Sequence, residues 1–530
     1  MNWKTSFIRK ISYITAMVLL LFPLFLLGQP ETRSKAGGKL SQLRTTYGLS
    51  QAELGDIDPV GASMQLATFG MRGVAAAVLW EKATRYKKTE DWDNLTATLN
   101  QITKLQPNFL SVWKFQAHNL SYNISSEFDD YRHRYHWVKK GISFLVNGTK
   151  YNRHQPKLLM EVGRYTGQKI GRSDEHVQFR EMFRDDKMFH DSFADHVDAT
   201  RAMGAMGKPD NWLVARMWYA EAEVAVEKEG MPFVGSSPVI FFMSNPFALI
   251  QYAMAIEDEG ILDEKGREAF RRAGQQWEAF GNRELEGPYG GRIRLNDVAV
   301  HRQAGFEYLA RISELAPGLK EKIYNEKLAQ LDASSREALD TPAESRSKLQ
   351  QELAGIAMQD LEIMPQEMAE RVPSASRKKA MRLAELASRR DKLARETEFS
   401  KGNVNYDYWR TRCRIEQTRL ATNARKAVRD ANVNYRSGDP LSARKKFEEA
   451  WGLWYSLFDK NPSMWKSETA EALMPDIQSY FECLEQLDVD RPRDFKLVRL
   501  LQQYELNANA RPTDVKSLFP SLSEEQNPNQ

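Results

Sequence analysis

Apolar residues recur through most of this chain at the spacing of one face of an α-helix. Similar stripes appear in Met71, Val74, Val78 and Leu79, in Leu95, Leu99, Ile102 and Leu105, in Leu110, Trp113, Ala117 and Leu120, in Tyr135, Val138, Ile142 and Leu145, and in Leu158, Val162 and Tyr165. The breaks between stripes are short, and the strict alternation of a half-buried strand is scarce. The sequence therefore predicts an all-α fold of short antiparallel helices packed in pairs, and not a parallel sheet with crossover helices.

Composition excludes several other classes of protein. The 530 residues include 75 Lys or Arg and 71 Asp or Glu, a net charge of +4, so the molecule as a whole is no polycation. Glycine and proline are too scarce for a fibrous or largely disordered chain. Cys413 and Cys483 are the two cysteines, too few for a disulfide scaffold or a zinc site made only of cysteines.

An uncharged apolar run follows a basic tail at the N-terminus. Residues 1–10 contain Lys4, Arg9 and Lys10, and a helix over Ile11–Gly28 would span about 27 Å, nearly a bilayer core. A cleaved signal peptide has the same order of basic and apolar residues, but its apolar part is usually shorter and ends in small residues. We expect a single-pass anchor at 11–28, with the body on the periplasmic side.

Breaks in the helical pattern suggest an order of segments behind this anchor. We expect a linker at 29–65, helical repeats at 66–171, an irregular helical domain at 172–316 with an apolar loop at 230–246, long charged helices at 317–430 that form a coiled hairpin, a repeat with terminal helices at 431–510, and a disordered tail at 511–530.

Two stretches carry the spacing of a known helical repeat. Small and aromatic residues recur at Ala431, Tyr435, Gly438, Ala443, Phe447 and Ala450. This run resembles the tetratricopeptide repeat (TPR) family, and Asp91–Asn108 is similar to the second helix of such a repeat, with Pro107 at its closing position. The resemblance implies stacked helical hairpins. Leu95 and Ile102 depart from it, because the family prefers alanine there.

A looser likeness covers more of the chain. The anchor, the early repeat and the stretches Phe280–Asp297 and Asn405–Ala431 resemble a group of uncharacterised membrane-anchored helical proteins from planctomycete bacteria. That resemblance implies a bacterial cell envelope and no particular activity.

Aromatic and aliphatic residues supply the candidate partner-binding positions. The expected loop at 230–246 has too many apolar side chains for an exposed connection, so it either plugs the interior or lines a groove. The candidates are Phe233, Val239, Phe241, Phe242, Tyr435 and Phe447. We therefore expect a membrane-anchored scaffold that binds other proteins and has no enzymatic activity.

A basic stretch gives the first alternative, which is binding of an anionic polymer such as nucleic acid or of lipid headgroups. Residues 376–430 hold 16 Lys or Arg against seven Asp or Glu, with Arg410, Arg412 and Arg414 in a row of alternate positions. Arg292 and Arg294 flank a glycine-rich stretch whose backbone amides are a further candidate anion site. Nucleic acid is not an expected partner, because the chain is expected to be exported.

A metal-dependent enzyme is the second alternative. Asp129, His133 and His136 fall on one helical face at i, i+4 and i+7, which provides a partial ligand set. No further ligand lies nearby, and the sequence contains neither a H-E-x-x-H motif nor a G-x-S-x-G motif. We therefore expect no cofactor and no catalytic residue.

Overall fold

The computed structural model describes residues 72–232 and 237–507 and a few isolated positions before them. Within these ranges the predicted all-α class is confirmed, since regular structure is almost entirely helical. Apart from isolated positions, the expected anchor at 11–28 and the linker at 29–65 lie outside the described residues, as do Phe233 and the tail at 511–530. The chain divides into two compact units, here called the N-terminal unit (residues 1–235 and 247–261) and the C-terminal unit (residues 236–246 and 262–530).

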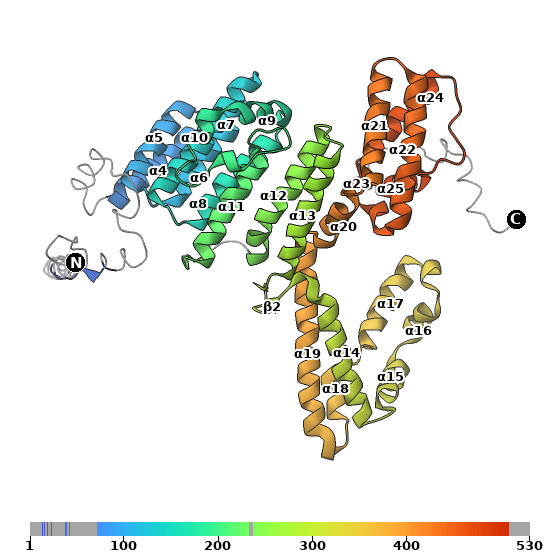
Figure 1. Ribbon diagram of the computed structural model, residues 1–530. Helices are drawn as coiled ribbons and strands as arrows, with labels where there is room; N and C mark the ends of the chain where they lie inside the picture. Colours follow the sequence, from blue (N-terminus) through green and yellow to red (C-terminus); the bar gives the residue numbers. More distant parts are fainter. Residues whose placement is uncertain are drawn as a thin grey trace, which may run out of the picture. The chain divides into compact units, whose positions relative to one another are not determined.

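Helices pack in pairs in the N-terminal unit (Figure 1). In chain order the unit contains α4 (Arg72–Lys88), α5 (Trp92–Leu105), α6 (Leu110–His118), the π-helical turn η1 (Asn119–Ile124), α7 (Tyr131–Tyr151), α8 (Pro156–Arg164), the π-helical turn η2 (Tyr165–Lys169), α9 (His176–Asp185), α10 (Lys187–Asp191), η3 (Ala199–Arg201) and α11 (Asn211–Glu227). Helix α4 packs on α5, α6 on α7, and α8 on α11.

The predicted apolar stripes explain this packing. Leu95, Leu99 and Ile102 of α5 are fully buried, and so is Val112 of α6. Val78 is an exception, because 60% of it is exposed. Side-chain caps fix several helix starts: Asp91 accepts a hydrogen bond from the backbone N–H of Asn94 at the start of α5.

Helix α12 (Pro238–Asp258) corrects the prediction of a loop at 230–246. Three prolines in this stretch suggested a break, but Pro238 is the first helical residue, where a missing N–H costs nothing. Pro246 is accommodated inside the helix, at the point where the two units divide. Val239 and Phe241 are buried, so a helix that satisfies its own backbone groups covers the apolar residues better than a loop does.

The same helix is the one membrane-span candidate among the described residues. Its length and hydropathy suffice for a crossing, but half of the apolar window is buried by the protein. The helix thus has the burial expected of a core helix.

Long helices form an arm in the C-terminal unit. Helix α13 (Glu264–Asn282) leads through the two-stranded antiparallel hairpin β1 (Leu285–Glu286) and β2 (Arg292–Ile293), with Leu285 paired to Ile293, and through η4 (Leu295–Asp297), into α14 (Val298–Leu315). Helix α14 packs along α19 (Ser374–Asn403), as Figure 1 shows. Along the chain, α14 and α19 are separated by five short helices. These are α15 (Leu319–Gln330), α16 (Ala333–Asp340), η5 (Ala343–Ser345), α17 (Lys348–Asp360) and α18 (Pro365–Glu370).

The helices over residues 317–373 are shorter than the predicted long ones, with breaks at 341–342, 361–364 and 371–373. Residues 317–373 form short helices because capping residues begin a new helix at several points in this stretch. Asp332 accepts from the N–H of Ser335, and Ser347 and Gln350 form a reciprocal capping box. The long partner of α19 is α14, which precedes the predicted segment.

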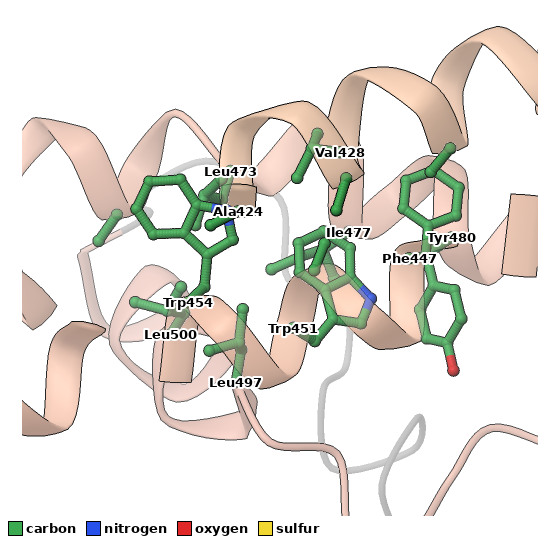
Figure 2. Packing of buried hydrophobic residues seen from close by; sticks show 14 of the residues in the cluster. Ala424, Val428, Phe447, Trp451, Trp454, Leu473, Ile477, Tyr480, Leu497 and Leu500 are labelled. Carbon is green, nitrogen blue, oxygen red and sulfur yellow. The ribbon is translucent and has the colours of Figure 1, made fainter. Parts of the chain in front are cut away.

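Helical hairpins end the C-terminal unit. They comprise α20 (Tyr406–Glu416), α21 (Arg419–Arg436), α22 (Pro440–Lys460), η6 (Pro462–Lys466), α23 (Glu468–Glu471), α24 (Met474–Gln486) and α25 (Val498–Asn507). Small residues of α21, including Ala424, let α22 approach closely, and Trp451 and Trp454 fill the space between α22 and its neighbours (Figure 2). Gly438 makes the turn between α21 and α22 with a φ of +80°, a conformation that favours glycine.

Candidate functional site

The basic row on α20 is tied to acceptors inside the protein. Arg410 Nε lies 3.0 Å from a carboxylate oxygen of Glu278, and Arg414 donates to the side-chain oxygen of Asn461 at 3.2 Å. Arg412 is buried and donates to the Tyr408 hydroxyl at 3.3 Å. The three arginines therefore do not form the free anion-binding row that their spacing suggested. Residues two positions apart on a helix point in different directions, so each of the three arginines contacts a different neighbour.

The glycine-rich loop between β1 and β2 binds a carboxylate through its backbone amides, and this carboxylate is a side chain of the same protein. Glu396 of α19 is 1% exposed, and its Oε1 accepts hydrogen bonds from the backbone N–H groups of Tyr289 at 2.8 Å and Gly291 at 3.3 Å. Arg292 and Arg294 are exposed and face Glu284 at 3.8 Å and 3.7 Å. The loop amides are thus occupied by an internal carboxylate, which corrects the prediction of an external one.

The residues predicted for metal binding do not assemble into a site. Asp129, His133 and His136 are exposed, and the two imidazole rings contact Phe128 and Trp137 instead of each other. Among the residues that the structure describes, no three His, Cys, Asp or Glu side chains gather as metal ligands do.

Both cysteines are buried in apolar surroundings. Burial raises the pKa of Cys413 to about 12, so its thiol is protonated at neutral pH. Burial also raises the pKa of Cys483, whose Sγ lies 3.1 Å from the carbonyl oxygen of Pro440. Neither thiol has the low pKa of a nucleophile.

Most of the predicted partner-binding positions contribute to packing instead. Phe447 of α22 is fully buried in the apolar cluster that α22 forms with α21 and α24, where Figure 2 shows its ring beside Tyr480. Val239 and Phe241 are buried as well, and the Phe242 ring lies 3.7 Å from the guanidinium of Arg283. Tyr435 is half-buried, with its hydroxyl 3.0 Å from the Gln486 amide. Phe447, Val239 and Phe241 therefore offer little surface to a partner, whereas Tyr435 and Phe242 stay partly exposed.

A cleft in the arm was not predicted. The hollow, here called the arm groove, has a volume of about 780 Å³ and opens between α14, α15 and the segment that joins α17 to α18. Its lining is mainly apolar and consists of Phe306, Leu309, Ala310, Ser313, Glu314, Pro317, Lys320, Tyr324, Leu361, Ile363 and Met368.

The base of the arm groove is buried in the apolar core, and the residues along its sides are exposed. Met368 is 2% exposed and belongs to the apolar cluster that joins α14, α15, α18 and α19. Phe306 and Tyr324 are 64% and 43% exposed, and both line the groove. Phe306 shares one face of α14 with Leu309, Ala310 and Ser313, a helical stripe that the sequence analysis did not single out.

The chain matches no protein-family model, no curated protein and no solved structure.

Proposed function

We propose that this chain is a membrane-anchored helical scaffold of the bacterial cell envelope that binds other proteins. The arm groove is the observation that carries the proposal. Its volume lies within the range of clefts that bind ligands, and its apolar floor and aromatic walls suit the apolar face of a partner helix. Glu314 and Lys320, which carry opposite charges in the lining, would help to orient that helix.

The strength expected of such a contact is appreciable. Full burial of an aromatic side chain contributes about 2 kcal/mol, which corresponds to about thirtyfold in affinity. Phe306 and Tyr324 are both exposed and lie on different helices, so one inserted segment would cover both. Such central aromatic anchors commonly dominate the energy of protein interfaces.

The rest of the proposal draws on the sequence. The pairing of α4 with α5 and of α21 with α22 supports a tetratricopeptide-like architecture, and the turn at Gly438 is consistent with it. Residues 11–28 supply the anchor, and the basic residues before them favour a periplasmic body. We propose no catalytic residue and no cofactor.

Site-specific photocrosslinking of the full-length chain in its native membrane tests this function. A benzoylphenylalanine in place of Phe306 is expected to form a discrete protein adduct, which the substitution Tyr324→Glu on the facing helix abolishes. Leu441 is a matched control, because it is 70% exposed and lies on α22 away from the groove lining. Equal adducts from positions 306 and 441, or adducts that persist in Tyr324→Glu, would contradict a role for the groove.

A further inference from the structure

A second surface of different chemistry lies in the N-terminal unit. It is formed by residues of the first helix in each packed pair, α4, α6 and α8, and of the π-helical turns that continue α6 and α8. We call it the cation–aromatic face, and it consists of Lys87, Lys114, His118, Tyr122, Glu161, Arg164 and Lys169.

Aromatic rings hold the cations in place across neighbouring helices. The Lys87 ammonium lies 5.1 Å from the centre of the Phe115 ring, and the Lys169 ammonium lies 4.3 Å from the centre of the Tyr122 ring. The His118 ring stacks on Tyr122 at 4.7 Å. Because such cation–ring contacts restrict long side chains, these charges are already ordered before anything binds.

The two π-helical turns set the positions of this face. Turn η1 contains Tyr122, and η2 contains Lys169. Glycines let neighbouring helices approach both turns: a Cβ on Gly141 would lie 2.0 Å from the Ser121 hydroxyl, and one on Gly167 would lie 2.8 Å from the Trp212 ring. Single π-helical turns within helices are often found at functional sites.

The face has an excess of positive charge. Glu161 lies 2.7 Å from Lys114 and accepts from Arg164 Nε at 2.8 Å. Glu175 and Asp174 also act on Lys169, but Arg134 opposes their effect and forms an ion pair with Glu175, so that with Arg134 five cations face three carboxylates. Burial lowers the pKa of His118, and the charges of Arg164, Lys87 and Lys169 lower it further, against an opposing effect of Glu161. The part of this lowering that comes from the three cations is what an excess of positive charge around the imidazole produces.

We propose that the cation–aromatic face binds an extended acidic segment of a partner protein. The charge complementarity favours carboxylates, and the preceding Glu161 contacts show how the face accommodates one. Packed helices stand about 8–10 Å apart, and an extended chain advances about 3.3 Å per residue. A segment that crosses α4, α6 and α8 would thus meet cations of a new helix about every third residue, which predicts Asp or Glu at every third position.

The rings argue against single-stranded nucleic acid as the occupant. Binding of bases requires open ring faces for stacking. Here Lys169 lies over Tyr122, Arg164 lies over Tyr165 at 4.6 Å, and Tyr165 is only 2% exposed. The aromatic rings position cations and present little free surface to a base.

Peptide binding by the full-length chain in nanodiscs of neutral lipid tests the proposal by fluorescence anisotropy. A labelled nonapeptide with Glu at every third position is expected to bind more tightly than a peptide of the same composition with clustered acids, and the affinity should fall as salt is raised. Lys87→Glu, at an exposed position, should weaken binding about tenfold or more. Lys169→Gln removes a half-buried cation without introducing a buried acid and should weaken binding in the same direction.

Lys157→Glu is the matched control, because this exposed α8 residue changes the net charge equally but lies outside the face. Its affinity for the peptide should stay within about twofold of the wild type. Equal binding of both peptides, or no effect of Lys87→Glu and Lys169→Gln in folded protein, would overturn the proposal. So would tighter binding of a labelled single-stranded RNA, or displacement of the peptide by phosphatidylglycerol vesicles but not by phosphatidylcholine vesicles. Phe306→Glu is expected to leave binding of this peptide unchanged, so failure of this proposal is distinguishable from failure of the arm groove.

Discussion

Arg180 and Asp210 form a buried ion pair in the N-terminal unit, with Nη2 and Oδ2 3.0 Å apart and each side chain 2% exposed. Glu259, which follows α12, joins them, because its Oε1 accepts from Arg180 Nε at 2.8 Å. Asn211 accepts from a third nitrogen of the same guanidinium. The pair therefore connects α9, the start of α11 and the segment after α12 through one side chain.

Removal of this guanidinium should strongly destabilise the protein. Arg180→Ala leaves the carboxylate of Asp210 buried without its main partner, and the expected loss of unfolding free energy is about 3–5 kcal/mol. Chemical denaturation followed by circular dichroism measures the loss. Arg302→Ala is the control, since its ion pair with Glu398 is about half exposed on both sides. An unchanged midpoint in Arg180→Ala would show that the buried network contributes nothing net.

Acid should weaken the same network. Burial acts to raise the pKa of Glu259, but hydrogen bonds and charge from Arg180 and Arg184 outweigh it and hold the pKa below its ordinary value. Because the carboxylate is favoured in the folded state, its stabilisation is present above about pH 4.5 and is lost as the pH falls through the lowered folded-state pKa. The free energy of unfolding measured from pH 7 down to pH 3 should fall less steeply in Glu259→Gln than in the wild type. Parallel curves for the two proteins would contradict this assignment.

The hairpin loop between β1 and β2 should not tolerate a side chain at Gly291. A Cβ there would lie 2.4 Å from a carboxylate oxygen of Glu396 and 2.8 Å from Leu393, so Gly291→Ala should cost about 1–3 kcal/mol through displacement of a buried carboxylate. Gly402→Ala is the control, because a Cβ at that helical position meets nothing within 4 Å. Thermal unfolding should show a lower midpoint for Gly291→Ala alone, and equal midpoints would contradict the close contact.

Deletion of residues 1–28 distinguishes the two apolar segments as membrane anchors. If residues 11–28 supply the anchor and α12 is a core helix, the shortened chain should leave the membrane fraction and remain in the supernatant after ultracentrifugation. Retention in the pellet after a wash with sodium carbonate would instead favour α12 as a span. Refolding of the shortened chain, checked by circular dichroism, excludes aggregation as the cause of sedimentation.

The sequence predicted helices well where burial alone determines them. Leu95, Leu99 and Ile102 repeat at the period of a helix, and a periodic apolar face needs no knowledge of its partner to be recognised. The stretch at 230–246 was mispredicted because proline was interpreted as a break, although the first turn of a helix accepts it.

The candidate sites were harder to predict because their partners are distant in sequence. Arg410 and Glu278 are far apart along the chain, so nothing local showed that the charge is neutralised. The arm groove was missed for the same reason: Phe306 and Met368 meet only after α14 and α18 have packed together. Spacing in the sequence places residues on one helix face, and packing determines what that face meets.

Glu396 has a final consequence for the hairpin loop that it holds. A dissolved anion at such a nest of amides would come and go with its concentration, whereas this carboxylate is attached to α19 and is always present at the same effective concentration. The order of the loop should therefore be indifferent to the phosphate or sulfate content of the surroundings. Because these amides bind a carboxylate of the same chain, the connection between α13 and α14 should stay the same whichever anions the medium contains.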